Sequence, residues 1–593
     1  MYPMVPRAGF SRPLRLSGAR SLASRLSIRP SWVCPSCIHA PSPARRAMSS
    51  ASDSSDPPKP FYVTTPIFYV NASPHVGHMY TMMLADSLKR WQTLRQRKAI
   101  LLTGTDEHGM KVQRAAAQQG VSAKELCDNN SQKFRELAAA CGIDNDIFVR
   151  TTDPDHLQAV QHFWFLLREG GHIYETTHSG WYCVSDECFY AEDEIERTVV
   201  PLTGRTIMAS IVSGNEVEWI EEKNYHFRMT AFRDQLLKFY EENPNWILPK
   251  SRMNEVVHWV TNNLEDLSIS RPVSRLDWGI RVPDDPSQTI YVWVDALINY
   301  ITKAGFPNWA PGDPVKDKGG WPADVQIIGK DILRFHGVYW PALLMAVGIE
   351  PPKQLLSHAH WTLGKKKMSK SLGNVVNPFF AIERWGLDAM RYFMLHDGGI
   401  ENDADYENSL ILARYEKDLQ STIGNTLGRV TRSEKWKLTD AVARARTQPA
   451  DSDFARKLRD SLVKSIQNAA PSMATAMEER LNPSAAIGVA IDLLVEANRY
   501  ISFVEPWKQQ ATPHLRDEAI YHTAEALRVA AILLQPFMPD KMSDMLDILG
   551  VAEDKRTFEQ AGFGADLEYG ESKMRLLRPG KWTTLFPPPA AKD

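Results

Sequence analysis

Residues 61–104 read FYVTTPIFYVNASPHVGHMYTMMLADSLKRWQTLRQRKAILLTG. The β-branched and aromatic run at 61–65 is typical of a buried strand, and 99–103 is typical of a second one. Apolar residues at helical spacing separate them, behind a turn in which Ser73 suits a helix N-cap and Pro74 the first helical position. Strand, helix and strand at this spacing predict a βαβ unit, and so a parallel sheet that binds ligands at the carboxyl ends of its strands.

Two histidines stand at the start of this helix, in the sequence His75-Val76-Gly77-His78. A helix N-terminus offers N–H groups and the positive end of the helix dipole, which together favour phosphate. Imidazoles there donate to phosphate oxygens as charge builds in a transition state, and Gly77 leaves room for a flat ligand against the backbone. By itself the histidine pair suits metal ligation or capping equally well.

A second candidate phosphate site is the basic segment Lys367-Met368-Ser369-Lys370-Ser371, which lies between Gly364 and Gly373. Glycines on both sides are typical of a mobile loop, whose lysines would neutralise a triphosphate when the loop closes. A solvated run of lysines is the ordinary alternative, so this segment indicates a phosphate site only when other motifs of such a site accompany it.

Together, HVGH at 75–78 and KMSKS at 367–371 resemble the two signature motifs of the class I aminoacyl-tRNA synthetases. Further segments are similar to the methionine-specific members of that class: 63–71 (VTTPIFYVN), 103–109 (TGTDEHG), 291–296 (YVWVDA) and 329–336 (GKDILRFH). The resemblance runs from Phe61 to Lys508.

This resemblance implies an α/β fold: a Rossmann-like parallel-sheet catalytic domain with a small inserted domain, followed by an all-α helix-bundle anticodon-binding domain. The α/β pattern is interrupted near 177, resumes with expected strands at 289–294 and 325–329, and gives way to helical segments after 405. We divide the chain into a leader and linker (1–58), two catalytic halves (59–176 and 251–356), the insert (177–250), the KMSKS-loop region (357–405), the helical domain (406–570) and a tail (571–593).

The implied activity is ATP-dependent ligation of methionine to its tRNA through methionyl-adenylate, with Mg²⁺ accompanying ATP. No general base is needed, because the methionine carboxylate is itself the nucleophile, so positioning and charge stabilisation do the catalytic work. The resemblance assigns ATP binding to His75, Gly77, His78, Gly329, Asp331, Lys367 and Lys370, and catalysis to His75, His78, Lys367 and Lys370.

The implied methionine pocket has a polar end and an apolar slot. Asp106, at a strand end, would accept from the ammonium group, and His336 would reach the base of the slot with a polar tip. Aromatic rings suit the thioether, because sulfur packs well at ring edges. The expected walls are Tyr69, Trp293 and Tyr300, lined further by Pro66, Ile67, Ala296 and Leu297; many relatives have proline in place of Leu297.

In the helical region, Asn425, Arg429, Pro506 and Trp507 match the positions with which these enzymes read the anticodon CAU of methionine tRNA. Tryptophan stacks on an unstacked base, while asparagine and arginine bond base edges. A helix-capping tryptophan is the structural alternative. The chain ends soon after this region, so we expect no appended tRNA-binding or dimerisation module, and a monomer.

Cysteine spacing departs from that of many relatives, whose inserts hold zinc in C-x2-C pairs. Here Cys183 and Cys188 form C-x4-C, and six cysteines in 593 residues indicate a reducing compartment rather than a disulfide framework. Cysteines alone cannot complete a four-ligand site, so we expect no structural zinc, although His178 and Asp186 leave that question open.

Residues 1–52 contain no acid and eight arginines, with many Ser and Pro, which is the composition of an organellar transit peptide. A disordered basic tail or a wrongly assigned start of the chain is the alternative; we expect a mitochondrial matrix enzyme. The net charge of −2 does not by itself indicate a nucleic-acid partner, but a local basic face would suffice to bind one. No segment reaches the apolar length of a membrane span, so we expect no membrane partner.

Two other functions fit part of this pattern. A synthetase for isoleucine, valine or leucine would carry a large editing insertion, for which 177–250 is too short. A catalytically idle RNA-binding protein on the same scaffold would need neither HVGH nor KMSKS. Amino-acid-dependent exchange of pyrophosphate into ATP separates all three.

Overall fold

The computed structural model describes residues 59–200, 204–211, 213–368, 375–447, 453–572 and 584–588. The expected leader and linker (1–58), Lys370 and most of the expected tail (571–593) lie outside the described residues, as does the side chain of Lys367.

Among the described residues, none of the helices combines the length and the apolar character that a membrane crossing requires.

A parallel sheet forms the centre of the first half of the described chain. Within the described residues it has six strands, in the order β3-β2-β1-β14-β15-β9, and every neighbouring pair is parallel. Their bounds are β1 (Phe61–Tyr69), β2 (Ala99–Asp106), β3 (Ile147–Arg150), β9 (Ile247–Leu248), β14 (Val325–Gly329) and β15 (Leu355–His358). The predicted βαβ unit is confirmed, and both of its strands run farther than expected, to Tyr69 and to Asp106.

The helix of this unit, α1 (Val76–Leu94), begins later than predicted. Its N-cap is His75, not Ser73, and Pro74 precedes the helix. The reason is a reciprocal cap: Nδ1 of His75 accepts from the Gly77 N–H at 3.0 Å, and Nδ1 of His78 accepts from the His75 N–H at 3.0 Å. Two imidazoles thus cap the helix N-terminus, whereas the prediction expected the hydroxyl of Ser73 to cap it.

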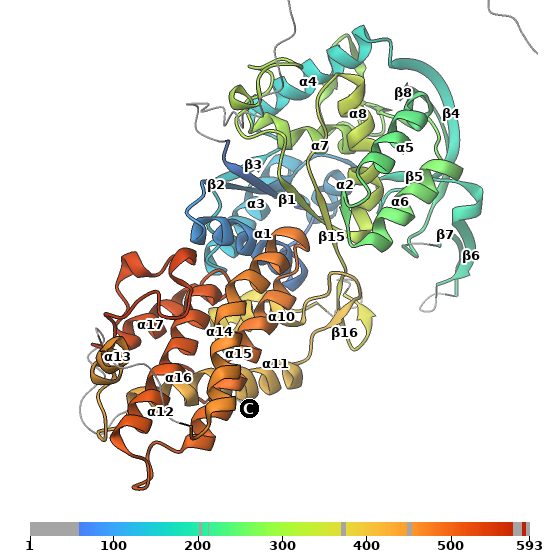
Figure 1. Cartoon of the computed structure of the whole chain (residues 1–593). Helices are drawn as coiled ribbons and strands as arrows, with labels where there is room; N and C mark the ends of the chain where they lie inside the picture. Colours follow the sequence, from blue (N-terminus) through green and yellow to red (C-terminus); the bar gives the residue numbers. More distant parts are fainter. Residues whose placement is uncertain are drawn as a thin grey trace, which may run out of the picture. The chain divides into compact units, whose positions relative to one another are not determined.

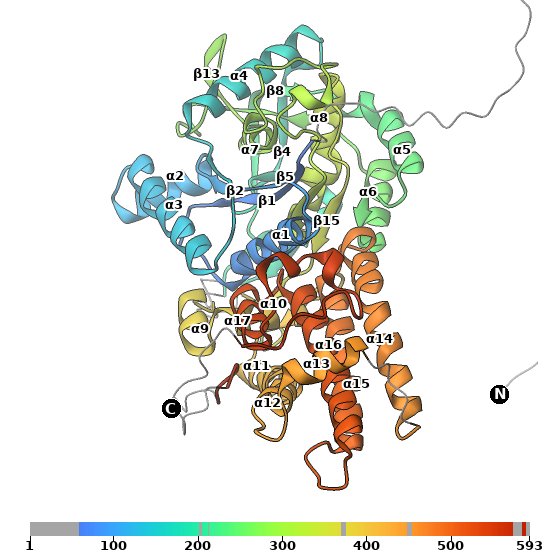
Figure 2. The same cartoon turned by 60° about the vertical axis from the view of Figure 1, so that its left-hand side comes forward.

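Helices cover both faces of the sheet. Helix α1 packs on one face, and Figure 2 shows α4 (Pro154–Glu169), α7 (Val292–Thr302) and α8 (Trp340–Ala346) on the other side of β1 and β2. The predicted strand at 289–294 is wrong, because β13 ends at Ile290 and α7 begins at Val292. Every residue of α7 is buried and its first three residues are apolar, so the sequence at the start of this helix resembles that of a buried strand.

A second, antiparallel sheet stands beside this layer, in the order β10-β8-β4-β5. The expected insert, 177–250, covers most of it, but β4 already begins at Ile173, and β9 joins the parallel sheet. Two small sheets, β6-β7 and β11-β13-β12, and helices α5 and α6 lie nearby in the sequence. The bounds are β4 (Ile173–Cys183), β5 (Cys188–Tyr190), β6 (Ile195–Val199), β7 (Thr206–Ser210), β8 (Glu218–Phe227), α5 (Arg233–Glu242), α6 (Lys250–Asn262), β10 (Leu267–Ser268), β11 (Ser270–Pro272), β12 (Arg281–Val282) and β13 (Asp285–Ile290).

Helices dominate the chain after β18 (Ala404–Asp405), as predicted (Figure 1). A continuous hydrophobic core joins them to α1. At this junction the buried guanidinium of Arg391 lies 2.6 Å from Asp86 of α1 and donates to the carbonyl of Pro536. The remaining bounds are α2 (Met110–Gln119), α3 (Ala123–Ala140), β16 (Trp361–Leu363), β17 (Lys366–Lys367), α9 (Pro378–Trp385), α10 (Leu387–Asp397), α11 (Asn408–Arg414), α12 (Asn425–Thr431), α13 (Leu438–Thr447), α14 (Arg456–Ala474), α15 (Pro483–Val504), α16 (Pro513–Leu534) and α17 (Pro539–Leu549).

Candidate functional site

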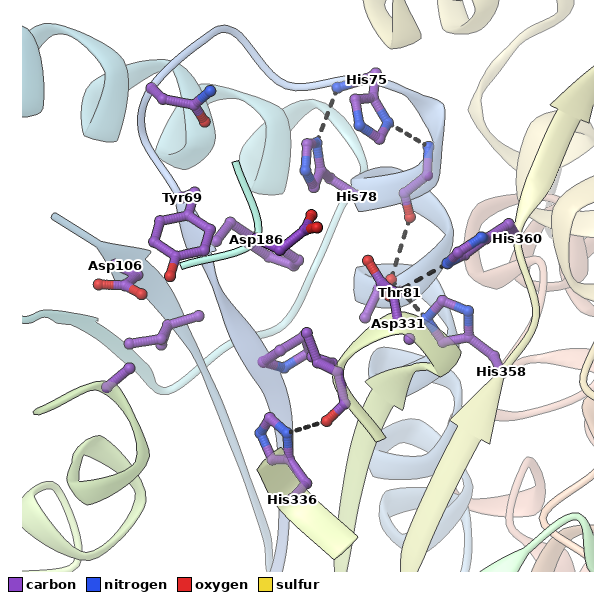
Figure 3. A pocket seen from close by; sticks show the side chains of 18 of the residues that line it. Tyr69, His75, His78, Thr81, Asp106, Asp186, Asp331, His336, His358 and His360 are labelled. Carbon is purple, nitrogen blue, oxygen red and sulfur yellow. Dashed lines mark hydrogen bonds and ion pairs between the residues drawn. The ribbon is translucent and has the colours of Figure 1, made fainter. Parts of the chain in front are cut away.

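A cleft of about 530 Å³ opens at the carboxyl ends of the parallel strands. Its lining includes the last residues of β1, β2, β14 and β15 (Figure 3). Every predicted methionine contact lines it, and so do the described members of the predicted ATP set. These residues are Pro66, Ile67, Tyr69, Asp106, Trp293, Ala296, Leu297, Tyr300 and His336, and His75, Gly77, His78, Gly329 and Asp331. The carboxyl ends of the parallel strands therefore meet at one edge of the sheet and bring residues from four separate segments to one place.

Aromatic rings enclose one end of the cleft. The edge of Tyr69 meets Trp293, with ring centroids 6.2 Å apart and planes at 85°. Trp293 in turn lies flat on Phe335, at 3.6 Å and 9°. His336, from the π-helical turn η6 (Phe335–Tyr339), completes this wall edge-on to Trp293 at 6.4 Å. The space between these rings is apolar and suits an unbranched, polarizable side chain.

Three buried polar atoms of this end have no hydrogen-bond partner among the described residues. They are the Tyr69 hydroxyl, Oδ1 of Asp106 and Nε1 of Trp293. A buried polar group without a partner costs about 1–3 kcal/mol, so such groups are rare unless something else satisfies them. Their clustering in the cleft points to a polar ligand with hydrogen-bond donors for Asp106 and Tyr69 and an acceptor for the Trp293 N–H.

Asp106 is set up to receive a positive charge. Burial, together with the nearby carboxylates of Asp295 and Glu187, raises its pKa well above the ordinary value. The anionic form is therefore costly until a cation arrives. An ammonium group beside Asp106 would remove that cost, which favours an amino acid as the ligand of this end.

A buried chain of charged and polar groups supports this end from behind. The carboxylate of Asp295, on α7, lies 2.7 Å from Nδ1 of His108 and 2.8 Å from Nε2 of His156. Burial alone would raise its pKa, but the two imidazoles hold the pKa of Asp295 below its usual value. His156 also contacts the Thr302 hydroxyl at 3.1 Å. These bonds fix α7, and with it Trp293 and Ala296, relative to α4 and to the loop after β2.

The two histidines of the first motif are held rigidly at the other end of the cleft. Their rings stack at 3.8 Å, and His78 also meets Phe68 and Phe134 edge-on at 5.1 Å each. Both Nδ1 atoms accept backbone N–H groups, so any proton on either ring is carried by Nε2, which can then act as a donor to a ligand. A Cβ on Gly77 would lie 2.8 Å from Cε1 of His75, so only glycine lets that ring fold back over the helix.

One turn farther along α1 from the two histidines, beside the end of β15, lies a cluster of polar side chains that local sequence patterns did not predict. His358, at the end of β15, places Nε2 at 2.9 Å from the hydroxyl of Thr81, and His360 lies 3.2 Å from Asp331 (Figure 3). Burial lowers the pKa of His358 to about 4, so its ring is neutral. Both histidines follow a strand of the parallel sheet, so the strand-end rule applied to 355–358 would have found them.

Lys111 and Asp186 also line the cleft without having been predicted. The Lys111 ammonium lies 4.9 Å from the ring centroid of Tyr69, which places a cation beside the polar end. Lys111 occupies an ordinary helix position, and Asp186 is brought in by the second sheet, so neither carried a signal in the sequence. In the basic motif, Met368 lines the cleft and Lys367 pairs with Thr362 in a two-strand ladder. Residues 369–374, with Lys370, lie outside the described part.

The turn between β4 and β5 lies between Cys183 and Cys188, the two cysteines considered as zinc ligands in the sequence. Asp186 joins three elements there: it accepts from the Tyr190 hydroxyl at 3.0 Å and from the Asn215 amide at 2.7 Å, and it bonds the Ser213 hydroxyl. Cys183 and Cys188 face each other across the strand pair. Among the described residues, no group of three or more His, Cys, Asp and Glu side chains is arranged to hold a metal ion. The absence of zinc stays a prediction for analysis of the protein.

The residues predicted to read an anticodon meet on the helical region. Asn425 and Arg429 are both exposed on α12, four residues apart. The Arg429 guanidinium lies 5.7 Å from the Trp507 ring centroid, and its Nη1 donates to Asn498 at 2.6 Å and Ser502 at 2.7 Å. Trp507 is half-buried three residues beyond the end of α15, and Pro506 is buried. The geometry unites Arg429 and Trp507 as a cation–π pair.

Comparison with known proteins identifies the family of this chain. The family model described as tRNA synthetases class I (M) matches residues 61–431. A Neurospora crassa protein named "Probable methionine--tRNA ligase, mitochondrial" is 56% identical over 98% of this chain and 95% of its own. A protein of the same name from Schizosaccharomyces pombe is 40% identical over 87% and 94%. The structure of Mycobacterium tuberculosis methionyl-tRNA synthetase in complex with methionyl-adenylate is 38% identical, covers 89% of this chain and all of its own, and superposes with a TM-score of 0.78. The chain therefore belongs to the class I methionyl-tRNA synthetases.

Proposed function

We propose that the cleft at the ends of β1, β2, β14 and β15 forms methionyl-adenylate and then transfers the methionyl group to tRNA. In the first step the methionine carboxylate attacks the α-phosphorus of ATP, and pyrophosphate leaves. In the second step a ribose hydroxyl of the terminal adenosine of tRNA attacks the acyl carbon, and AMP leaves. Both steps need positioning and neutralisation of negative charge rather than a dedicated base.

The observation that carries this proposal is the cluster of unsatisfied polar atoms inside an aromatic wall. The methionine ammonium would donate to Asp106 and to the Tyr69 hydroxyl. Its thioether would lie against the rings of Trp293 and His336, which contact each other edge to face and present ring edges to the sulfur. A branched aliphatic side chain would leave His336 without a polarizable partner and would widen near Cβ, where Tyr69 and Trp293 approach each other.

ATP would bind at the opposite end. Nε2–H groups of His75 and His78 and the N–H groups that start α1 would donate to its phosphates. Asp331 and Gly329, at the end of β14, would contact the ribose, as ligands do beside a parallel sheet. Lys367 and Lys370 would neutralise the departing pyrophosphate. Mg²⁺ would enter with the triphosphate, because it is usually held by phosphate oxygens and water rather than by a protein cage.

The tRNA would be recognised far from this chemistry. Trp507 would stack on an unpaired base of the anticodon CAU, while Asn425 and Arg429 would bond base edges. The Arg429–Trp507 pair supports this assignment because it presents a cation and a ring together on an exposed face. Residues 1–52, rich in arginine and free of acid, and the mitochondrial names of the two fungal relatives support the mitochondrial matrix as the place of action. We further propose a monomer.

The test is exchange of labelled pyrophosphate into ATP by the purified protein in the presence of Mg²⁺. Methionine should support exchange, and leucine, isoleucine and valine should hardly do so. Stronger exchange with a branched amino acid would overturn the methionine assignment. Binding of tRNA without exchange would favour the catalytically idle RNA-binding alternative.

A further inference from the structure

We propose that Phe454 and Phe503 form a second stacking platform, on which an unpaired base of the tRNA anticodon arm rests beside the bases met by Trp507. The inference rests on the proposed anticodon surface and extends it to residues at which no RNA contact has been assigned. The ligand is the flat face of a base, so the contact would add affinity without selecting sequence.

The two rings form an exposed aromatic stack. Phe454, just before α14, and Phe503, in the last turn of α15, stack with centroids 5.5 Å apart and planes at 26°. Each is 52% exposed. Figures 1 and 2 both show α14 and α15 side by side, so the pair bridges two neighbouring helices at their ends. Burying a phenylalanine fully is worth about 1.5–3 kcal/mol, and much of that gain is not realised here.

The platform continues the predicted anticodon surface. Phe503 directly follows Ser502, whose hydroxyl accepts from Arg429 at 2.7 Å. Arg429 also lies over Trp507, which is four residues beyond Phe503. Successive side chains of a helix point about 100° apart, so Phe503 faces α14 while Ser502 faces Arg429 of α12. The two aromatic sites therefore share the end of α15 but not one face, and we propose that a single-stranded loop wraps this end to reach both.

The charges around the two rings suit a polyanion. Two cations of the predicted anticodon surface donate to neutral groups: Arg429 donates to Asn498 and Ser502, and Lys435 donates to the Trp507 carbonyl at 2.6 Å. Lys457, in the first turn of α14, is exposed. Other cations there, Arg456, Arg499 and Lys508, pair with Asp453, Glu496 and Glu505. Cations and exposed aromatic rings thus occur together at this end of the helical region, as they do on surfaces that bind single-stranded nucleic acid.

Alanine and tyrosine variants of Phe503 test this platform. We expect Phe503→Ala to lower kcat/KM for charging of a methionine tRNA transcript by about 5-fold or more, the low end of the loss when a stacked aromatic is removed. Phe503→Tyr keeps the ring and should charge at the wild-type rate. Methionine-dependent pyrophosphate exchange should stay unchanged in both. Phe165→Ala, which removes a 44% exposed ring from α4 in the catalytic half, is the matched control and should leave charging unchanged.

Salt dependence separates stacking from charge. Lys457→Ala should lower the slope of log K against log salt for tRNA binding by about 0.7, the value for one phosphate contact on a single strand. Phe503→Ala should weaken binding and leave this slope as in the wild type. A changed slope in Phe503→Ala would contradict a stacking role.

Several results would overturn the platform. Normal charging by the Phe454→Ala, Phe503→Ala double variant would do so, as would a parallel loss of exchange, which would make the rings structural. The wild type could prove to be a dimer that Phe503→Ala converts to a monomer with normal charging. That result would show that the phenylalanine pair contacts a second copy of the chain and not tRNA. If Trp507→Ala lowers charging and the double variant does not, the platform fails and the anticodon surface stands. If neither lowers charging, both are wrong.

Discussion

The hydroxyl of Tyr300 lies 2.7 Å from Nε2 of His336 and joins α7 to the π-helical turn at the base of the aromatic slot. Nδ1 of His336 lies 3.1 Å from the Ile332 carbonyl, so that nitrogen carries the proton. Burial lowers the pKa of His336 to about 4, which keeps the ring neutral. Tyr300 therefore donates and His336 accepts, and the polar tip of the slot is fixed in one tautomer.

Loss of this hydroxyl should weaken methionine binding selectively. Tyr300→Phe leaves a buried acceptor unsatisfied, at a cost of about 1–3 kcal/mol. We expect the KM for methionine in pyrophosphate exchange to rise about 10-fold, within that range, while the KM for ATP changes little. Tyr62→Phe is the control, since its hydroxyl bonds the Tyr300 carbonyl but Tyr62 does not line the cleft. Equal effects of the two variants on the KM for methionine would remove Tyr300 from the slot.

Two buried histidines should make the fold sensitive to mild acid. Burial lowers the pKa of His336 and of His358 to about 4, below the ordinary value of 6.5. Between about pH 6.5 and pH 4 these histidines bind protons in the unfolded chain but not in the folded chain. The free energy of unfolding should therefore fall as the pH drops from about 6.5 to about 4. Each histidine contributes on the order of 3 kcal/mol above that window.

The measurement is urea unfolding of wild type and His358→Gln across this window. Asp388, whose pKa burial raises to about 6, acts in the opposite direction, so the comparison between the two proteins isolates the histidine. The variant should lose less stability between neutral and acid pH than the wild type. Identical pH profiles would show that His358 titrates normally in the folded protein.

Catalysis should depend on the signature histidine. We expect His78→Ala to lower the kcat of adenylation by about 100-fold or more, which corresponds to roughly 2.7 kcal/mol of transition-state stabilisation. The KM for methionine should change little, because His78 stands at the ATP end. His78→Asn offers an acceptor to the His75 N–H and should recover helix stability without recovering the rate. Lys370→Ala should lose rate by a similar factor, and near-normal turnover would remove either residue from the catalytic set.

The insert should keep its shape without zinc. Asp186 ties the β4–β5 turn to Tyr190, Ser213 and Asn215 through its carboxylate, so these bonds hold the turn without a metal ion. Elemental analysis of the purified protein should find no stoichiometric zinc, and activity should survive EDTA once Mg²⁺ is restored. Asp186→Ala should lower thermal stability, while Asp186→Asn retains some of these bonds and should lower it less. One zinc per chain would contradict this prediction.

Removal of the predicted anticodon tryptophan should separate charging from adenylation. A stacking aromatic contributes about 1–3 kcal/mol per base, so Trp507→Ala should lower tRNA charging by about 5- to 150-fold. Pyrophosphate exchange should stay near normal, because the cleft belongs to the parallel sheet. A tRNA whose anticodon cytosine is replaced should lose charging by the wild type as well. Normal charging by Trp507→Ala, or a parallel fall of exchange, would make this residue structural.

Short segments of the chain were enough to predict much of the site. The β1–α1–β2 unit follows from apolar periodicity, and Asp106 and Gly329 could be placed at one edge because parallel strands end together. Tyr69 was expected from the family resemblance, because the first strand was predicted to end before it. Apolar periodicity failed to distinguish a buried helix from a buried strand, because both can begin with an uninterrupted run of apolar residues. Val292 opens a helix rather than a strand.

Contacts between distant segments had no local signature. Thr81 meets His358 across 277 positions, and Asp295 lies between His108 and His156 from two other elements. Such pairs depend on the order in which strands assemble, here β1 beside β14 and β14 beside β15. That order is set by the free energy of packing the whole core, to which each residue contributes little, whereas helix periodicity and strand ends are properties of a few neighbouring residues.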